Sequence, residues 1–183
     1  MQRRLDNNAS QPIGVSMGIN SILASMFRYK IWADDLLFIG LDEFKSRSTE
    51  GDFDTAVRLI DHGRIVSRIF LAHLEGSEHS YETTEPDVAP ELHELKSSVS
   101  DTNNRYLEYV ENISSTILEE EIRFHFTDGS IGRMSREEML CHVLLHSGYH
   151  RGEVGRIMTQ VMGRSPRDTF TGFLHEVQKG RRN

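Results

Sequence analysis

Three histidines stand four residues apart in one stretch of the chain: His142, His146 and His150. A four-residue step turns about 40° around a helix axis, so neighbouring members of the series share a face and two imidazole rings can reach one metal ion. The rings of His142 and His150, two steps apart, diverge too far to bind together comfortably. The spacing therefore predicts His146 and His150 as a ligand pair. It predicts His142 as a residue of the surrounding pocket that contacts a cofactor or supports the ligands.

A third metal ligand must come from another helix, because a catalytic metal usually takes three protein ligands and keeps a position for water or substrate. The candidate is His62, whose polar ring interrupts an apolar stripe and would be costly to bury without a partner. Gly148 and Gly152 stand inside the helix of the pair, where each glycine costs about 1 kcal/mol relative to alanine. We interpret them as marks of a close approach to the backbone. The alternative is a chance histidine pair on a solvated helix face.

Other polar and aromatic residues are candidates for the same site. Three neutral imidazoles leave a divalent ion its full charge, which suits Lewis-acid work on a bound thiol or water. Glu153, one helical turn from His150, is the local candidate for a general base. Arg151 is a candidate for binding an anionic substrate group, although pairing with a surface carboxylate is the commoner fate of an arginine. Tyr149 and Trp32 are candidates for lining the pocket, with a place in the core as the alternative.

Four long helices are expected to position these residues, because apolar side chains recur at three- and four-residue steps in four segments. The expected helices run over residues 21–44, from a cap at Asp52 or Asp54 to Gly76, over residues 91–114, and from a capping box at Ser135 and Glu138 to Gly163. Residues 77–90 predict a long crossover connection. A short helix is expected within residues 168–177.

A β-hairpin is predicted over residues 121–134, because apolar and polar residues alternate there and Asp128-Gly129 is a strong turn signal. The expected fold class is therefore all-α, a four-helix bundle with a small β-hairpin before the last long helix. We expect one domain over residues 1–183, with a flexible N-terminal extension at residues 1–17 and a polar tail at residues 178–183.

Composition and charge narrow the classes of function. The chain has 183 residues and a formal net charge of -7, which argues against a nucleic-acid partner. Its apolar runs are too short for a membrane span or a signal peptide, so no membrane partner is expected. The single cysteine, Cys141, forms no intrachain disulfide and fits a reducing cytosol, which predicts a cytoplasmic location.

Three pieces of sequence also carry a family resemblance: residues 146–153 (HSGYHRGE), His62 in a Leu-x-x-His setting, and Tyr29-x-x-Trp32-Ala33-Asp34. From about residue 26 to 174 the chain resembles the DinB-like (DinB/YfiT) superfamily. The resemblance implies an up-down-down-up bundle, frequent homodimers, and a three-histidine site for zinc, nickel or a similar divalent ion such as iron or manganese. By position, it carries the ligand roles over to His62, His146 and His150.

Two positions depart from the family pattern. Asp34 stands where the family commonly has Asn, and Glu153 where it commonly has Gln. Characterised members include thiol-dependent S-transferases and isomerases, so the resemblance implies a metal-dependent enzyme with a small-molecule substrate. It would activate a low-molecular-weight thiol for attack on a small electrophile, with hydrolysis by activated water as the nearest variant. The alternative from another class is a non-catalytic metal-binding stress or damage-response protein.

Overall fold

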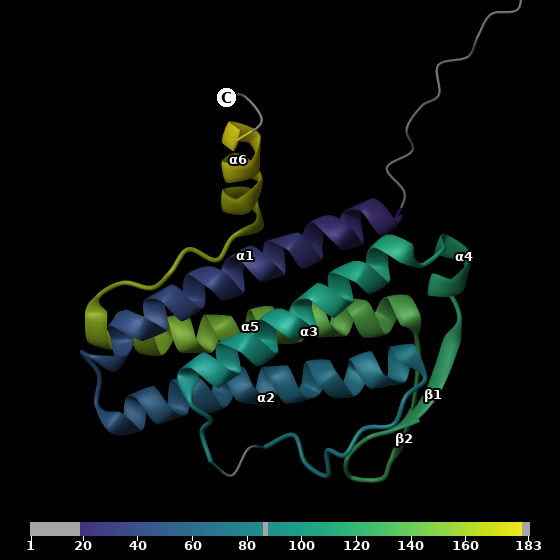
Figure 1. Ribbon diagram of the computed structural model, residues 1–183, viewed down its shortest axis with the longest axis horizontal. Helices are drawn as coiled ribbons and strands as arrows, with labels where there is room; N and C mark the ends of the chain where they lie inside the picture. Colours follow the sequence, from purple (N-terminus) through teal and green to yellow (C-terminus); the bar gives the residue numbers. More distant parts are fainter. Residues whose placement is uncertain (1–18, 86–87, 181–183) are drawn as a thin grey trace, which may run out of the picture.

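The computed structural model describes residues 19–85 and 88–180, and these form a helical bundle with a two-stranded hairpin (Figure 1). The long helices are α1 (Ile19–Lys45), α2 (Glu50–Glu75), α3 (Leu92–Asn112) and α5 (Arg136–Met162). The smaller elements are α4 (Ser115–Leu118), β1 (Glu121–His125), β2 (Ile131–Ser135) and α6 (Phe170–Gly180). The predicted fold class is confirmed. The predicted extension at residues 1–17 and the last three residues of the predicted tail lie outside the described residues.

The four long helices follow an up-down-down-up course (Figure 1). Helix α2 runs back along the bundle after α1, the crossover returns the chain to the end where α2 began, α3 runs parallel to α2, and α5 runs back. The main helix contacts are α2 with α5, α1 with α3, α1 with α5, and α2 with α3. Helices α2 and α5 are therefore neighbours, which is what a site built from both of them requires. Helix α6 contacts α1 and stands away from the bundle.

The ends of the helices follow from capping residues. Ser135 and Glu138 form the predicted capping box at the start of α5. Gly76 and Gly163 end α2 and α5 in the left-handed region, at φ 67° and 71°, where glycine has no steric penalty. The predicted cap of α2 at Asp52 or Asp54 is wrong. Helix α2 begins earlier because the side chain of Thr49 accepts a hydrogen bond from the backbone N–H of Asp52 and caps the helix.

The hairpin covers one end of the bundle. Strands β1 and β2 pair antiparallel, with Phe124 opposite Gly132. A Cβ atom at Gly132 would lie 2.4 Å from the ring of Phe124, so this position needs glycine. Because Gly132 has no side chain, the ring of Phe124 can lie across β2. The same ring contacts Phe70 of α2 edge to face, at 5.7 Å between ring centroids.

The apolar core has two parts. The part near the hairpin includes Phe27, Tyr106 and Met139, and the other includes Leu41, Val57 and Met158. Buried polar side chains, including Lys30, Asp34, Ser67, Thr102, Asn103, Ser147 and Arg151, lie at intermediate positions along the same helices. We call these seven residues the polar layer. None of the described helices has the length and apolar character needed to cross a lipid bilayer.

Candidate metal centre

Three histidine rings from two helices converge on one point. His62 comes from α2, and His146 and His150 come from α5, one turn apart on the face that packs against α2. The Nε2 atom of His146 lies 3.3 Å from Nε2 of His62 and 3.2 Å from Nε2 of His150. One nitrogen from each ring lies within 4.8 Å of the other two. The structure therefore brings the three predicted ligands together.

The neighbours of His62 and His150 set which ring nitrogen carries the proton. Nδ1 of His62 lies 2.9 Å from the carbonyl oxygen of Thr84, and Nδ1 of His150 lies 2.8 Å from a carboxylate oxygen of Glu153. Both partners are acceptors, so Nδ1 carries the hydrogen and donates it. The Nε2 atoms of His62 and His150 then carry no hydrogen, and each directs its lone pair at the common point. This pairing is the usual way in which a protein orients a metal-binding histidine.

The geometry and electrostatics fit a divalent ion. Two imidazole nitrogens on one tetrahedral zinc, each at about 2.1 Å, lie about 3.4 Å apart. The separations of 3.3 Å from His62 to His146 and of 3.2 Å from His150 to His146 are close to this value. Burial, with added repulsion from His150 and His62, lowers the pKa of His146 to about 4. Burial and His62 also lower the pKa of His150, against the opposing effect of Glu153. Both rings are therefore neutral at pH 7, as metal ligands must be.

Two predicted site residues on α5 lie behind or outside the three rings. Glu153 contacts Nδ1 of His150, on the edge of the ring opposite to Nε2. In this place it orients the ligand and is not beside the convergence point, where a general base is needed. Tyr149 is 64% exposed, and its ring lies edge to face against His150 at 5.1 Å between centroids.

Arg151 and Trp32 face away from the histidines. Arg151 is buried and donates to Asp34 at 3.1 Å and to Asp168 at 2.9 Å. Arg151 thus pairs with carboxylates, which was the alternative to binding an anionic substrate group. Asp34, however, is an interior residue and not a surface one. The indole N–H of Trp32 donates to Glu176 of α6 at 2.9 Å. The structure brings neither side chain to the convergence point.

His142, Gly148 and Gly152 are the other residues of α5 for which the sequence predicts a place in or near the site. The ring of His142 lies 5.3 Å from that of His146 and 4.6 Å from that of Phe70, measured between centroids, so it lies beside the ligands. The interpretation of Gly148 and Gly152 as close-approach positions is wrong. A Cβ atom at Gly152 would meet nothing within 4 Å, and one at Gly148 would make only an ordinary contact with Arg151.

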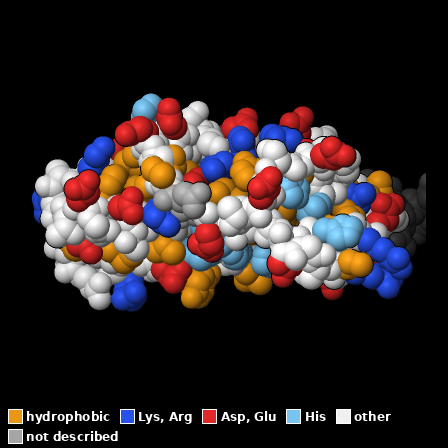
Figure 2. All heavy atoms as spheres, turned by 90° about the horizontal axis from the view of Figure 1, so that it is seen from below, with side chains coloured by type: hydrophobic (Ala, Val, Ile, Leu, Met, Phe, Trp, Pro, Cys, Tyr) orange, Lys and Arg blue, Asp and Glu red, His pale blue; other side chains and the backbone are white. Residues whose placement is uncertain are grey.

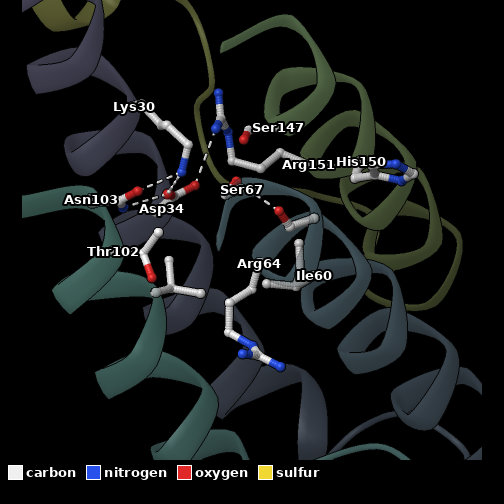
Figure 3. Close-up of a pocket in the computed structure, with 12 residues that line it drawn as sticks. Lys30, Asp34, Ile60, Arg64, Ser67, Thr102, Asn103, Ser147, His150 and Arg151 are labelled. Carbon is white, nitrogen blue, oxygen red and sulfur yellow. Dashed lines mark hydrogen bonds and ion pairs between the residues drawn. The ribbon is translucent and has the colours of Figure 1, made fainter. Parts of the chain in front are cut away.

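The polar layer lies on the inner side of His150 (Figure 3). Lys30 donates to Asp34 at 2.8 Å and to Asn103 at 2.6 Å, and Asn103 donates to Asp34 at 2.8 Å. Burial alone would raise the pKa of Asp34, but Lys30 and Arg151 hold it below its usual value. Asp34 is therefore ionised. An interior cavity of about 30 Å³ beside this network has room for a water molecule and reaches His150.

Two larger cavities open beside the histidines. The first, of about 350 Å³, is lined by Asp54, Thr55, Arg58, Leu59, His62, Glu85 and His150, and we call it the polar cavity. The second, of about 160 Å³, extends towards the hairpin, and its apolar lining residues are Val66, Ile69, Phe70, Phe124 and Phe126. We call it the apolar cavity. Figure 2 shows histidine side chains gathered on this face of the molecule, in the centre and towards the hairpin end.

Some residues around the site were not expected from the sequence. Thr84 contributes a main-chain carbonyl, which every residue type has, so no sequence signal marks it. His73 is another such residue, because no spacing relates it to the other histidines in the sequence. It lies half-buried on α2, its Nε2 atom is buried without a partner among the described residues, and its ring is 5.2 Å from that of His79. The apolar residues at the neighbouring positions Ile69 and Phe70 were the available signal.

Comparison with known proteins agrees with the fold and with the histidine pattern. The search of curated proteins gives no match to this chain. The family model described as the DinB family matches residues 17–182, a range that includes all three converging histidines. Since the match covers nearly the whole sequence, the chain belongs to the DinB family.

Proposed function

We propose that this protein is a divalent-metal-dependent enzyme that activates a low-molecular-weight thiol, or water in the nearest variant, for attack on a small electrophile. The observation that carries the proposal is the convergence of three imidazole rings, with one nitrogen of each within 4.8 Å of the other two. Thr84 and Glu153 direct the lone pairs of two of these nitrogens at that point. Zinc or nickel is the expected ion, because imidazole ligands suit both, and iron or manganese are the other candidates.

The residues of this chain supply binding and orientation. A divalent ion held by His62, His146 and His150 would supply Lewis acidity, lowering the pKa of a thiol or water that binds it. In the proposed transfer the thiol loses its proton, and its sulfur forms a bond to the electrophilic carbon. The leaving group departs with the electron pair of the bond that breaks, and solvent takes the thiol proton.

The polar cavity supports a thiol cosubstrate. It borders His62 and His150, and it carries both signs of charge through Asp54, Arg58 and Glu85. Small cellular thiols also carry charged groups, so charge complementarity favours their binding there. The predicted homodimer and cytoplasmic location remain predictions from the sequence.

The test is to load purified, tag-free protein with zinc or with nickel and to incubate it with a panel of cellular thiols and chlorodinitrobenzene. We expect metal-dependent release of chloride and formation of a thioether, both lost in His146→Ala. Metal content measured by mass spectrometry separates loss of binding from loss of turnover. Protein that takes up metal and transfers none of the thiols would favour the alternative, a non-catalytic metal-binding stress or damage-response protein.

A further inference from the structure

The apolar cavity is built from α2, α5 and the hairpin. Val66, Ile69 and Phe70 line it from α2, and Phe124 and Phe126 line it from β1 and the turn that follows. The aromatic rings contact one another, with centroids 5.7 Å apart for Phe70 and Phe124 and 4.9 Å apart for Phe124 and Phe126. The cavity therefore has a continuous aromatic wall that reaches from the buried core to the surface, where Phe126 is 45% exposed.

Histidines and threonines complete the lining of the apolar cavity: His62, His73, Thr84, His125, Thr127, His142 and His146. No Lys, Arg, Asp or Glu is among the residues that line the cavity. Burial, together with His79 and His125, lowers the pKa of His73. His73 is therefore neutral at pH 7, and the apolar residues of α2 and the hairpin offer an ionic group no charged partner.

The histidine site separates two spaces of opposite character. His62 lines both cavities, whereas His146 lines the apolar cavity and His150 lines the polar cavity. The polar cavity has about 350 Å³ and three charged side chains, and the apolar cavity has about 160 Å³ and an aromatic wall. Two reactants of different polarity can therefore approach the convergence point from different sides.

We propose that the apolar cavity binds an uncharged aromatic ring of the electrophilic substrate. The inference rests on the proposed function, since it names the class of electrophile that this site takes. A dry protein cavity of about 150 Å³ lined by Leu, Ile and Phe binds benzene, so the volume found here suits one six-membered ring. Edge-to-face contacts with Phe70 and Phe124 would orient the ring.

The experiment uses metal-free protein, in which no bound cation attracts an anion, and two probes of nearly the same shape. These are methyl phenyl sulfone, which is uncharged, and benzenesulfonate, which is an anion. Calorimetry is expected to show saturable binding of the sulfone and binding of the sulfonate weaker by at least about tenfold. Methyl NMR signals of Val66 and Ile69 should shift with the sulfone. The signals of Leu59, which lines the polar cavity, should not.

A variant in the hairpin tests the wall. Phe126→Ala removes an exposed lining ring with little risk to folding, and we expect it to weaken sulfone binding by about fivefold to tenfold. The matched control is Ile131→Ala, which removes a side chain that is 75% exposed on the same hairpin and is not a lining residue. It should leave the affinity unchanged.

The outcomes separate this inference from the proposed function. Equal binding of the two probes, no binding, or no effect of Phe126→Ala would overturn the ring site. Thiol transfer that is as fast with electrophiles that lack a ring as with uncharged aromatic ones would also overturn it, and would leave the proposed function standing. Selective sulfone binding by a protein that transfers no thiol would support the ring site and contradict the proposed function.

Discussion

Arg151 donates a hydrogen bond to Asp34 at 3.1 Å across the interior between α5 and α1. Lys30 approaches the other carboxylate oxygen of Asp34 at 2.8 Å, so one buried anion lies between two buried cations. Where the family commonly has Asn, this chain thus has a carboxylate that balances nearby charge. Asp34, which differs from the family pattern, therefore lies in the polar layer and not among the converging histidines.

Asp34→Asn is expected to destabilise the protein, because it leaves Lys30 and Arg151 with less neutralising charge in the interior. The expected loss is about 3 kcal/mol in the free energy of unfolding, since Asp168 still pairs with Arg151. Urea unfolding measures it. The matched control Asp35→Asn alters the neighbouring exposed residue and should change stability by less than about 0.5 kcal/mol. Equal stability of Asp34→Asn and the wild type would contradict the charge balance.

His62→Ala is expected to lower zinc affinity by more than about a hundredfold, because it removes one of three ligands and the only one from α2. Competition with a chromogenic chelator measures the affinity. His93→Ala is the control, since His93 is exposed on α3. If His62→Ala kept the wild-type affinity, the three-histidine site would be wrong.

Glu153→Ala is expected to weaken zinc binding by about tenfold to a hundredfold, because His150 loses the acceptor that fixes its tautomer. Glu153→Gln keeps an acceptor oxygen and should lie between Ala and the wild type. Glu94→Ala, at an exposed position on α3, is the control. An unchanged affinity in Glu153→Ala would show that the carboxylate does not orient the ring.

The regular part of this structure could be predicted from the sequence because its signals are local. The capping box at Ser135 and the left-handed caps at Gly76 and Gly163 depend on a few adjacent residues, and all three are confirmed. The predicted start of α2 was wrong because Asp52 and Asp54, like Thr49, are residue types that commonly cap helices. Asp52 has a different role, in which its backbone N–H donates to Thr49.

The converging pair of His146 and His150 was predictable for a similar reason, since the two residues share one helix. The surroundings were not, because they depend on long-range packing. Asp168 follows α5 by a loop and reaches back to Arg151, and Phe124 of the hairpin covers Phe70. Neither contact has a spacing that a single sequence can reveal. The apolar cavity exists only once the hairpin is in place, because Phe124 and Phe126 line it.

Metal-free protein is expected to lose stability as the pH falls from about 6.5 to about 4. An unfolded histidine takes up its proton near pH 6.5, whereas burial and the neighbouring histidines hold the pKa of His146 in the fold at about 4. Within this window the unfolded state binds more protons, so acid favours unfolding, and above it the contribution of His146 does not change.

Urea unfolding of metal-free protein at pH 7 and pH 5 measures this effect. His146→Gln removes the titrating ring and should reduce the difference between the two values of pH. His175→Gln, at an exposed position on α6, is the control and should keep the wild-type difference. An identical pH dependence in His146→Gln and the wild type would contradict the role assigned to burial at His146.

The acceptor that faces Nδ1 of His62 is the main-chain oxygen of Thr84. Every amino acid provides the same oxygen, so replacement of the side chain at position 84 leaves the acceptor in place. The contact of Glu153 with His150, in contrast, disappears with a single codon change to alanine. The orientations of these two rings therefore differ in genetic robustness: the contact that orients His62 survives substitution of its partner, and the contact that orients His150 does not.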